Sequence, residues 1–259
     1  MANELQGGGS LPHRLALREA IKTIEASGEY ICNNQPLATK NGKKNVRVAQ
    51  SYLWSQIPLN SNVSSYVFNV IDQQYNVGTQ GLLPMERRLK QQDVFFTYKL
   101  GFYLLCVSTA AETNYQFTLM TFPSANFYGN APWGIPIANL MGLWTAGQLN
   151  VTVNGDVLTP AWDMGQHLVI PQTQVPPVGI NGSPFFDQVN LNEDGYVVVE
   201  PNWIINGGNN NIYTVAYPNN YLNITTGSTG GIGNGFQLHL VLKWQGFLAQ
   251  NVSSIMDAK

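Results

Sequence analysis

The fold class is decided by residues 151–158, which read Val151-Thr152-Val153-Asn154-Gly155-Asp156-Val157-Leu158. β-branched residues flank an Asn-Gly pair, and such a pair is preferred in tight hairpin turns whose two central residues need positive φ. The stretch therefore predicts two antiparallel strands joined by a two-residue turn. Turn signals of the same kind recur at Asn181-Gly182, Asp194-Gly195, Asn206-Gly207 and Asn234-Gly235.

Outward from this hairpin, alternating apolar and polar residues between turn signals predict many more strands. The expected strands are Val46–Trp54, Tyr66–Ile71, Val94–Val107, Tyr115–Phe122, Leu149–Val153, Leu168–Ile170, Tyr196–Trp203, Ile212–Ala216 and Gln237–Leu248. Two short helices, each preceded by a proline, are expected at Leu83–Gln91 and Ile137–Ala146. Numerous strands with little helix favour a mainly β protein, a sandwich or jelly roll, over an α/β fold.

One amphipathic helix is expected before the β body, from His13 to Ser27, with Pro12 at its first position. Leu17, Ile21 and Ile24 follow the helical period and form an apolar stripe. Arg14, Arg18 and Lys22 repeat every four residues on another face of the same helix.

The composition is poor in charge, because Asp, Glu, Lys and Arg make up 11% of the 259 residues. An ordinary soluble domain has about 25%. A soluble monomer usually covers itself with these residues, so we expect this chain to place much of its surface against neighbouring molecules.

The cations are concentrated in the first hundred residues, whereas between Lys99 and Lys243 every ionic residue is acidic. We expect a basic N-terminal arm that faces an anionic interior, either nucleic acid or a lipid surface. The proposed inward-facing cations are Arg14, Arg18, Lys22, Lys40, Lys43 and Lys44. The alternative is an ordinary solvated helix face and linker, since Glu4, Glu19, Glu25 and Glu29 weaken the positive field.

Signals for chemistry are weak. His13, His167 and His239 have no metal-ligand spacing, and His167 is expected to be structural, because no nucleophile motif accompanies it. Asp187, Glu193 and Asp194 are a weak Ca²⁺ candidate, with a plain turn as the alternative. Cys106 is expected to be a buried apolar residue. We therefore expect a protein that is not an enzyme and that needs no cofactor or small-molecule substrate.

The chain resembles the jelly-roll major capsid proteins of tailless icosahedral bacteriophages with an internal membrane. The resemblance is carried by the basic arm of Pro12–Arg47, by the aromatic strand that begins at Asp93 and runs to Tyr103, and by the apolar strand Phe236–Leu248. It implies two jelly rolls in tandem, three subunits in each capsomer, and an arm directed toward the membrane or neighbouring capsomers.

The expected organisation is an arm at 1–45, a first jelly roll at 46–145, and a second jelly roll with a tail at 146–259. The alternative is one jelly roll with long loops across 46–259, as in a minor capsid or vertex protein. About ten strands are recognisable, whereas two rolls of eight strands need about sixteen.

The expected function is that of a virion shell protein that assembles with itself and with other capsid proteins. No apolar signal-peptide core is visible at the start of the sequence, so we expect assembly in the host cytoplasm. A carbohydrate-binding β-sandwich is the competing class. It would use aromatic residues such as Trp54, Trp133 and Trp162 to stack on sugars, but it leaves the basic helical arm unexplained.

Overall fold

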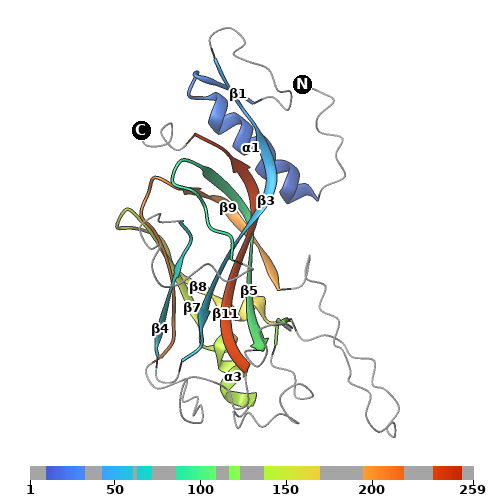
Figure 1. Cartoon of the computed structure of the whole chain (residues 1–259), viewed down its shortest axis with the longest axis vertical. Helices are drawn as coiled ribbons and strands as arrows, with labels where there is room; N and C mark the ends of the chain where they lie inside the picture. Colours follow the sequence, from blue (N-terminus) through green and yellow to red (C-terminus); the bar gives the residue numbers. More distant parts are fainter. Residues whose placement is uncertain are drawn as a thin grey trace, which may run out of the picture.

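The computed structural model describes residues 10–32, 43–60, 63–71, 86–108, 117–122, 137–169, 195–218 and 236–252. Within these ranges the protein is mainly β, with antiparallel sheets and a short N-terminal helix (Figure 1). The helical elements are α1 (Leu11–Glu25), α3 (Ile137–Thr145) and the 3₁₀ helix η2 (Met164–His167). The strands are β1 (Tyr30–Cys32), β2 (Lys44–Val46), β3 (Val48–Pro58), β4 (Ser65–Asn69), β5 (Val94–Ser108), β6 (Phe117–Met120), β7 (Gln148–Val153), β8 (Asp156–Asp163), β9 (Tyr196–Asn206), β10 (Asn211–Ala216) and β11 (Phe236–Ala249).

The larger sheet has the order β3-β11-β5, and β5 carries both β9 and β6 on its other edge. β9 pairs with residues 94–101 of β5, and β6 pairs with residues 104–107. All these pairs are antiparallel. β11 pairs with β5 over its whole length and with β3 from His239 to Ala249, so the last described strand lies inside this sheet.

The smaller sheet has the order β4-β10-β7-β8 and is also antiparallel. Its side chains alternate: Tyr66, Phe68, Tyr213 and Val215 are buried, and the residues between them are half-buried or exposed. One face of this sheet therefore packs on the core while the other faces outward. A separate pair of short parallel strands, β1 and β2, accompanies α1.

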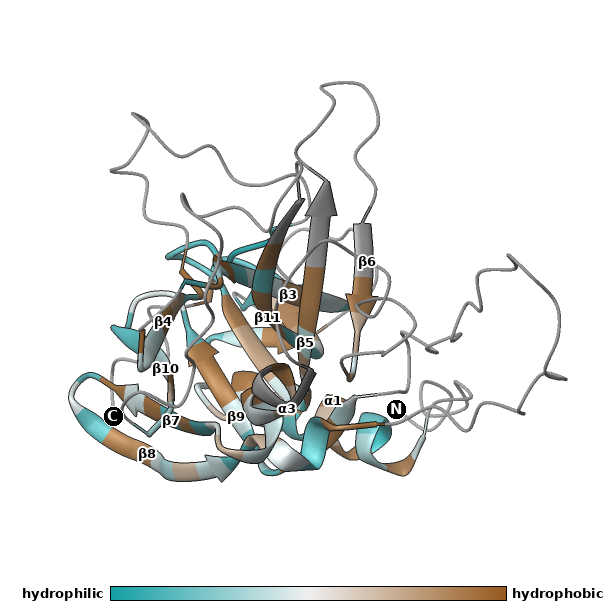
Figure 2. Cartoon of the chain, turned by 90° about the horizontal axis from the view of Figure 1, so that it is seen from below, coloured by the Kyte–Doolittle hydropathy of each residue, from teal (hydrophilic) through white to brown (hydrophobic). Residues whose placement is uncertain are grey.

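The main core lies between the two sheets. Trp244 of β11 meets Tyr213 of β10 edge to face, with ring centroids 5.2 Å apart, so the two sheets are in direct contact. At another point Phe102 of β5 packs on Trp144 of α3 at 5.8 Å. Figure 2 shows the apolar character of β5, which is buried on both of its faces.

Helix α1 covers the outer face of the larger sheet. Ala16, Ala20 and Ile24 pack against Phe96 and Phe247. Phe95, the neighbour of Phe96, belongs to the main core on the opposite face. The predicted helix is confirmed, but the contact stripe is Ala16-Ala20-Ile24, whereas Leu17 and Ile21 are half-buried at its flank. Two alanines allow the helix to approach an aromatic surface closely, which larger side chains would prevent.

A β-bulge in β5 changes which of its residues face the main core and which face α1. Gln245 pairs with Lys99 and Gly246 with Thr97, so Tyr98 is an extra residue on β5. An extra residue re-aims the side chains that follow it. Before the bulge the even-numbered residues Val94, Phe96 and Tyr98 pack beneath α1. After it the even-numbered residues Leu100, Phe102 and Leu104 lie in the main core instead.

Most predicted strands and the hairpin are confirmed. Asn154 (φ 53°) and Gly155 (φ 90°) form the two-residue turn between β7 and β8. The predicted helix Ile137–Ala146 corresponds to α3. The sequence reading missed β1, β2 and most of β8, the last because the hairpin's second strand extends to Asp163.

Two predicted elements are wrong in their described parts. Residues 86–91 are not helical: Arg87 pairs with Trp54 and Leu89 with Ile71, because the free backbone groups at the edges of the sheets offer hydrogen bonds there. Leu168 and Val169 are not in a strand, because they follow the 3₁₀ turn η2, which is capped by the carboxylate of Asp163 on the N–H of Gly165.

Candidate functional site

The predicted basic face of α1 is exposed. Arg14, Arg18 and Lys22 are exposed on the side of the helix away from the sheet. The packing of Ala16 and Ala20 fixes this orientation, since residues four apart share one helix face. Leu11 (62% exposed) and Leu15 (52% exposed) lie near the cations on the outer side, so this face combines charge with apolar surface.

Of the other three predicted cations, the structure describes Lys43 and Lys44. Lys44 is exposed on β2, with its ammonium 5.7 Å from the centroid of the Tyr30 ring, and Lys43 is half-buried just before it. The backbone N–H of Lys44 donates to the carbonyl of Glu29, which keeps β2 beside the end of α1. Lys40 lies outside the described residues.

Acidic side chains of α1 are engaged with neighbouring segments. The amide of Asn202 on β9 donates a hydrogen bond to the carboxylate of Glu19. The carboxylate of Glu25 accepts from the backbone N–H of Cys32 at 3.3 Å. These contacts anchor the helix to the body and to β1.

A lysine surrounded by aromatic rings lies on the same outer face of the larger sheet. The ammonium of Lys243 lies 5.6 Å from the ring centroid of Tyr52, 5.5 Å from that of Trp54 and 5.7 Å from that of Tyr196. Burial lowers the pKa of Lys243 below its ordinary value. Cation–π attraction offsets part of the cost of removing the ammonium from water, so this cation is held within the fold.

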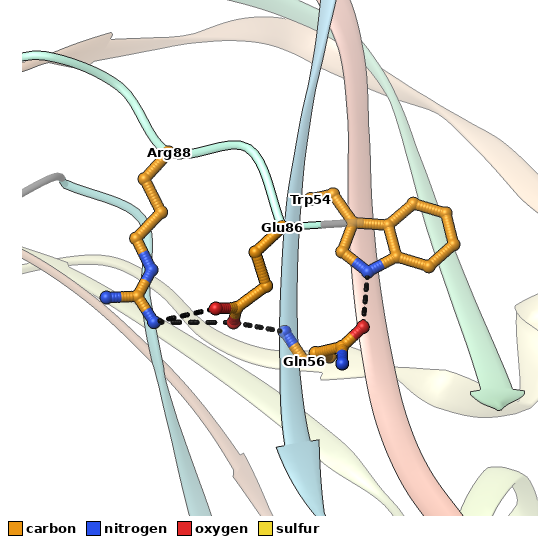
Figure 3. Close-up of polar contacts among 4 residues, drawn as sticks. All are labelled: Trp54, Gln56, Glu86 and Arg88. Atoms are coloured by element: carbon orange, nitrogen blue, oxygen red, sulfur yellow. Dashed lines mark hydrogen bonds and ion pairs between the residues drawn. The ribbon is translucent and has the colours of Figure 1, made fainter. Parts of the chain in front are cut away.

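A polar network beside this lysine ties residues 86–89 to β3 (Figure 3). The indole N–H of Trp54 donates to the side-chain oxygen of Gln56 at 2.9 Å. The backbone N–H of Gln56 donates to the carboxylate of Glu86, which also forms an ion pair with Arg88 at 3.3 Å. Together with the backbone pairing of Arg87 to Trp54 and Leu89 to Ile71, these bonds join the edge of β3 to the end of β4.

His167 is buried, and both of its ring nitrogens have partners. Its Nδ1 lies 2.9 Å from the carbonyl of Gly195, and its Nε2 accepts a hydrogen bond from the indole N–H of Trp162 at 3.0 Å. These partners require a neutral ring with the proton on Nδ1, which donates to Gly195. Burial lowers the pKa of His167 to about 4. Its ring therefore joins η2 and β8 to the start of β9.

Acid is expected to destabilise the protein through His167. Its folded-state pKa lies below the ordinary value of 6.5, so the unfolded chain binds the proton first and stability falls as pH drops from 6.5 to 4. For His167 the loss by pH 4.5 is about 2–3 kcal/mol. Urea unfolding at pH 7 and pH 4.5 measures it.

His167→Gln is the matched variant, because its amide can still donate to Gly195 and accept from Trp162 without titrating. We expect the variant to lose about 2–3 kcal/mol less than the wild type between the two pH values. An identical pH dependence in both proteins would show that His167 does not control acid stability. His239 is also buried, with its pKa lowered to about 4, and remains in both proteins as a common background.

The remaining predictions about chemistry are placed as follows. Asp187, Glu193 and Asp194 lie outside the described residues, and the described part of the chain contains no group of three His, Cys, Asp or Glu side chains able to hold a metal ion. The side chain of Cys106 also lies outside the described set. Cys32 is half-buried, and burial, followed by the charge of Glu25, raises the pKa of its thiol to about 12. Of the helices that are described, none is long and apolar enough to cross a bilayer.

Four tryptophans are buried rather than available for stacking on a sugar, namely Trp54, Trp144, Trp203 and Trp244. Trp162 is half-buried, and Trp133 lies outside the described residues. The aromatic residues described in the structure therefore serve chiefly the core and the surroundings of Lys243.

The Lys243 cluster was not predicted from the sequence. Its members come from β3, β9 and β11, and β3 ends at Pro58 whereas β9 begins at Tyr196, so no local spacing signals their meeting. A lone lysine within the apolar segment of β11 was the one available signal.

Searches of family models, of curated proteins and of solved structures gave no match to this chain.

Proposed function

We propose that this protein is a virion shell protein built on a single jelly roll, and that it acts by assembling with copies of itself and with other capsid proteins. The capsid is its proposed location, after assembly in the host cytoplasm. The single roll across 46–259 replaces two rolls in tandem as our preferred organisation. An assembly role needs no catalytic group and no cofactor.

The strand order is the observation that carries this proposal. Along the chain, β3, β4, β5 and β7 pair with β11, β10, β9 and β8 respectively, each pair antiparallel. Such nested pairing is what results when one long hairpin of eight strands is wrapped into two sheets, and a jelly roll is wrapped in this way. β6 lies on the edge of β5 beside β9, outside this scheme.

Both sheets contain strands from both ranges, which supports one jelly roll over two. β3 and β5 fall in the range 46–145, whereas β11, which separates them, falls in 146–259. In the smaller sheet β4 comes from the first range, and β10, β7 and β8 come from the second. A core built jointly by both ranges is expected of a single folding unit.

A jelly roll by itself does not identify a function, because capsid proteins, lectins and cupins share it. The low charge favours assembly, since uncharged surfaces meet without desolvating ions. The exposed cations of α1 give one side of the roll an affinity for anions, either nucleic acid or an internal membrane.

The proposal is tested by the native mass of the purified protein, measured by light scattering after size exclusion. A trimer or a larger closed particle supports a shell protein, and electron microscopy of the particles would then show their symmetry. A strict monomer at high concentration contradicts self-assembly and would favour the carbohydrate-binding class.

Neutralising the basic residues is expected to reduce particle yield without unfolding the body. The variant replaces Arg14, Arg18, Lys22, Lys40, Lys43 and Lys44 by glutamine. The described members of this set are exposed or half-buried, so the thermal transition should shift by no more than a few degrees. Wild-type particle yield from this variant would contradict a role for the basic face. Replacing Lys90, an exposed lysine outside the arm, is the matched control.

A further inference from the structure

The outward face of the smaller sheet is a continuous surface without charged side chains on three of its four strands. Cross-strand pairing places Val67, Thr214 and Asn150 in one row. Asn69, Ile212 and Thr152 form the row beside it. We name these two rows, together with the third row described next, the neutral face.

The neutral face extends by a third row, Ser65, Ala216 and Gln148, which again contains no ionic residue. Asp163 of β8, paired with Gln148, supplies the first charge, at the corner of the sheet. The side chains that alternate with these rows, such as Phe68, Tyr213 and Val151, are buried in the core, so the rows face away from it.

Such a surface is unusual for a sheet that meets water. Exposed strands are normally protected from association by charged side chains, lysine above all. Here Val67 is 51% exposed at the edge of the sheet, and Val157 of β8, paired with Thr152, is 62% exposed at the other edge. Isolated exposed apolar residues are ordinary. Here the one ionic side chain paired into these rows is Asp163, on the strand farthest from Val67, and Arg88 borders the sheet edge beside Val67.

The exposed cations of α1 are on the opposite side of the roll. Helix α1, with Arg14, Arg18 and Lys22, packs on the outer face of the larger sheet, and the main core separates that sheet from the smaller one. The two outer sides therefore differ in chemistry: one is basic and the other neutral. An anionic partner is attracted to the first side, and a neutral partner is best matched to the second.

We propose that the neutral face packs against the neutral face of a second copy of this chain. The inference rests on the proposed self-assembly and names the surface through which two copies meet. The same face on a second copy is also without charge, so contact between the two faces desolvates no ion. The side chains of Asn, Gln, Ser and Thr each donate and accept hydrogen bonds, so the same rows can satisfy one another across a two-fold axis.

The size of the face fits a contact that is weak alone. Three strands about 4.8 Å apart and five residues at about 3.4 Å give a footprint of roughly 250 Å². A stable pair of proteins needs roughly 800 Å² of accessible surface from each partner. Contacts below that size become effective when many are made in one closed assembly.

The test introduces charge at the exposed edge of the face. Val67→Lys should weaken self-association at least about a hundredfold, since like charges then meet across the contact. Val67→Thr keeps the face neutral and should associate as the wild type does. Gln50→Lys adds the same charge at an exposed position of β3 on the larger sheet and should also associate normally. Sedimentation equilibrium measures association, and circular dichroism checks that each variant is folded.

A mixing experiment distinguishes a copy of this chain from any other occupant. Val67→Lys and Val67→Glu should each be dissociated alone and should recover association when mixed, because opposite charges then face each other. Recovery supports pairing of like faces. A mixture that stays dissociated, or a Val67→Lys variant that associates as the wild type does, overturns it.

The two proposals fail in different ways. A wild-type protein that remains monomeric at every concentration, and forms no particles, overturns both. A wild-type protein that assembles while Val67→Lys assembles equally well leaves the shell function standing and removes the neutral face from it.

Discussion

Gly246→Ala is expected to destabilise the protein by about 3 kcal/mol or more, because there is no room for a side chain at this position. A Cβ on Gly246 would lie 2.1 Å from the backbone oxygen of Phe96 and 2.7 Å from the ring of Phe95. The nearest obstacle is backbone, and β5 is held on both sides by β11 and β9. β5 and β11 cannot separate here without breaking the larger sheet. Urea unfolding followed by tryptophan fluorescence measures the loss.

Gly155→Ala is the matched control. Gly155 has a positive φ of 90°, but a Cβ there would meet nothing within 4 Å. Its cost is the left-handed backbone alone, about 1 kcal/mol. If Gly246→Ala unfolded at the same urea concentration as the wild type, the close approach of β11 to β5 at the bulge would be wrong.

Trp244→Ala is expected to cost about 3–5 kcal/mol, the range for removing a large aromatic side chain from a core. Trp244 is fully buried and contacts Tyr213 edge to face across the two sheets. Its removal leaves a cavity at the point where both sheets meet. The free energy of unfolding in urea measures the effect, and in a marginal domain such a loss leaves little of the native state.

Two further variants define the origin of this loss. Trp244→Phe retains a ring against Tyr213 and should recover part of the stability. Leu158→Ala removes an apolar side chain that is 50% exposed, so it should cost well under 1 kcal/mol. Equal losses from Trp244→Ala and Leu158→Ala would contradict a core centred on Trp244.

The strands could be predicted because their signals are local. Alternation of side chains identified β7 and β10, and Asn154-Gly155 identified the turn between β7 and β8. β5 was predicted from its length and its aromatic residues. These features depend on residues adjacent in the chain, so a single sequence contains them.

The order of the strands could not be predicted, because it depends on contacts between distant residues. Nothing local to β11 indicates that it lies between β3 and β5. The segment at 86–91 shows the same limit. Its composition is compatible with a helix, yet Arg87 pairs with Trp54 of β3 and Leu89 pairs with Ile71 just beyond β4. The sequence does not place either partner beside this segment. Tertiary hydrogen bonds overrode local propensity there.

The candidate site, like the fold, could be predicted only in its local features. The period of four that links Arg14, Arg18 and Lys22 sufficed to place them together on an exposed helix face. The residues that hold that helix were misassigned, since a stripe of alanines is a weaker apolar signal than Leu17 and Ile21. The neutral face was not predicted either, because its rows combine three strands that are distant in the sequence.

The central position of β11 also has a consequence for synthesis on the ribosome. β3 and β5 do not pair with each other; each pairs with β11, and 141 residues separate the end of β5 from the end of β11. At about 5–20 residues per second, the two earlier strands wait roughly ten seconds for the strand that joins them. During that time their edges are open to other nascent chains. Close spacing of ribosomes on one message would therefore favour exchange of β11 between neighbouring chains.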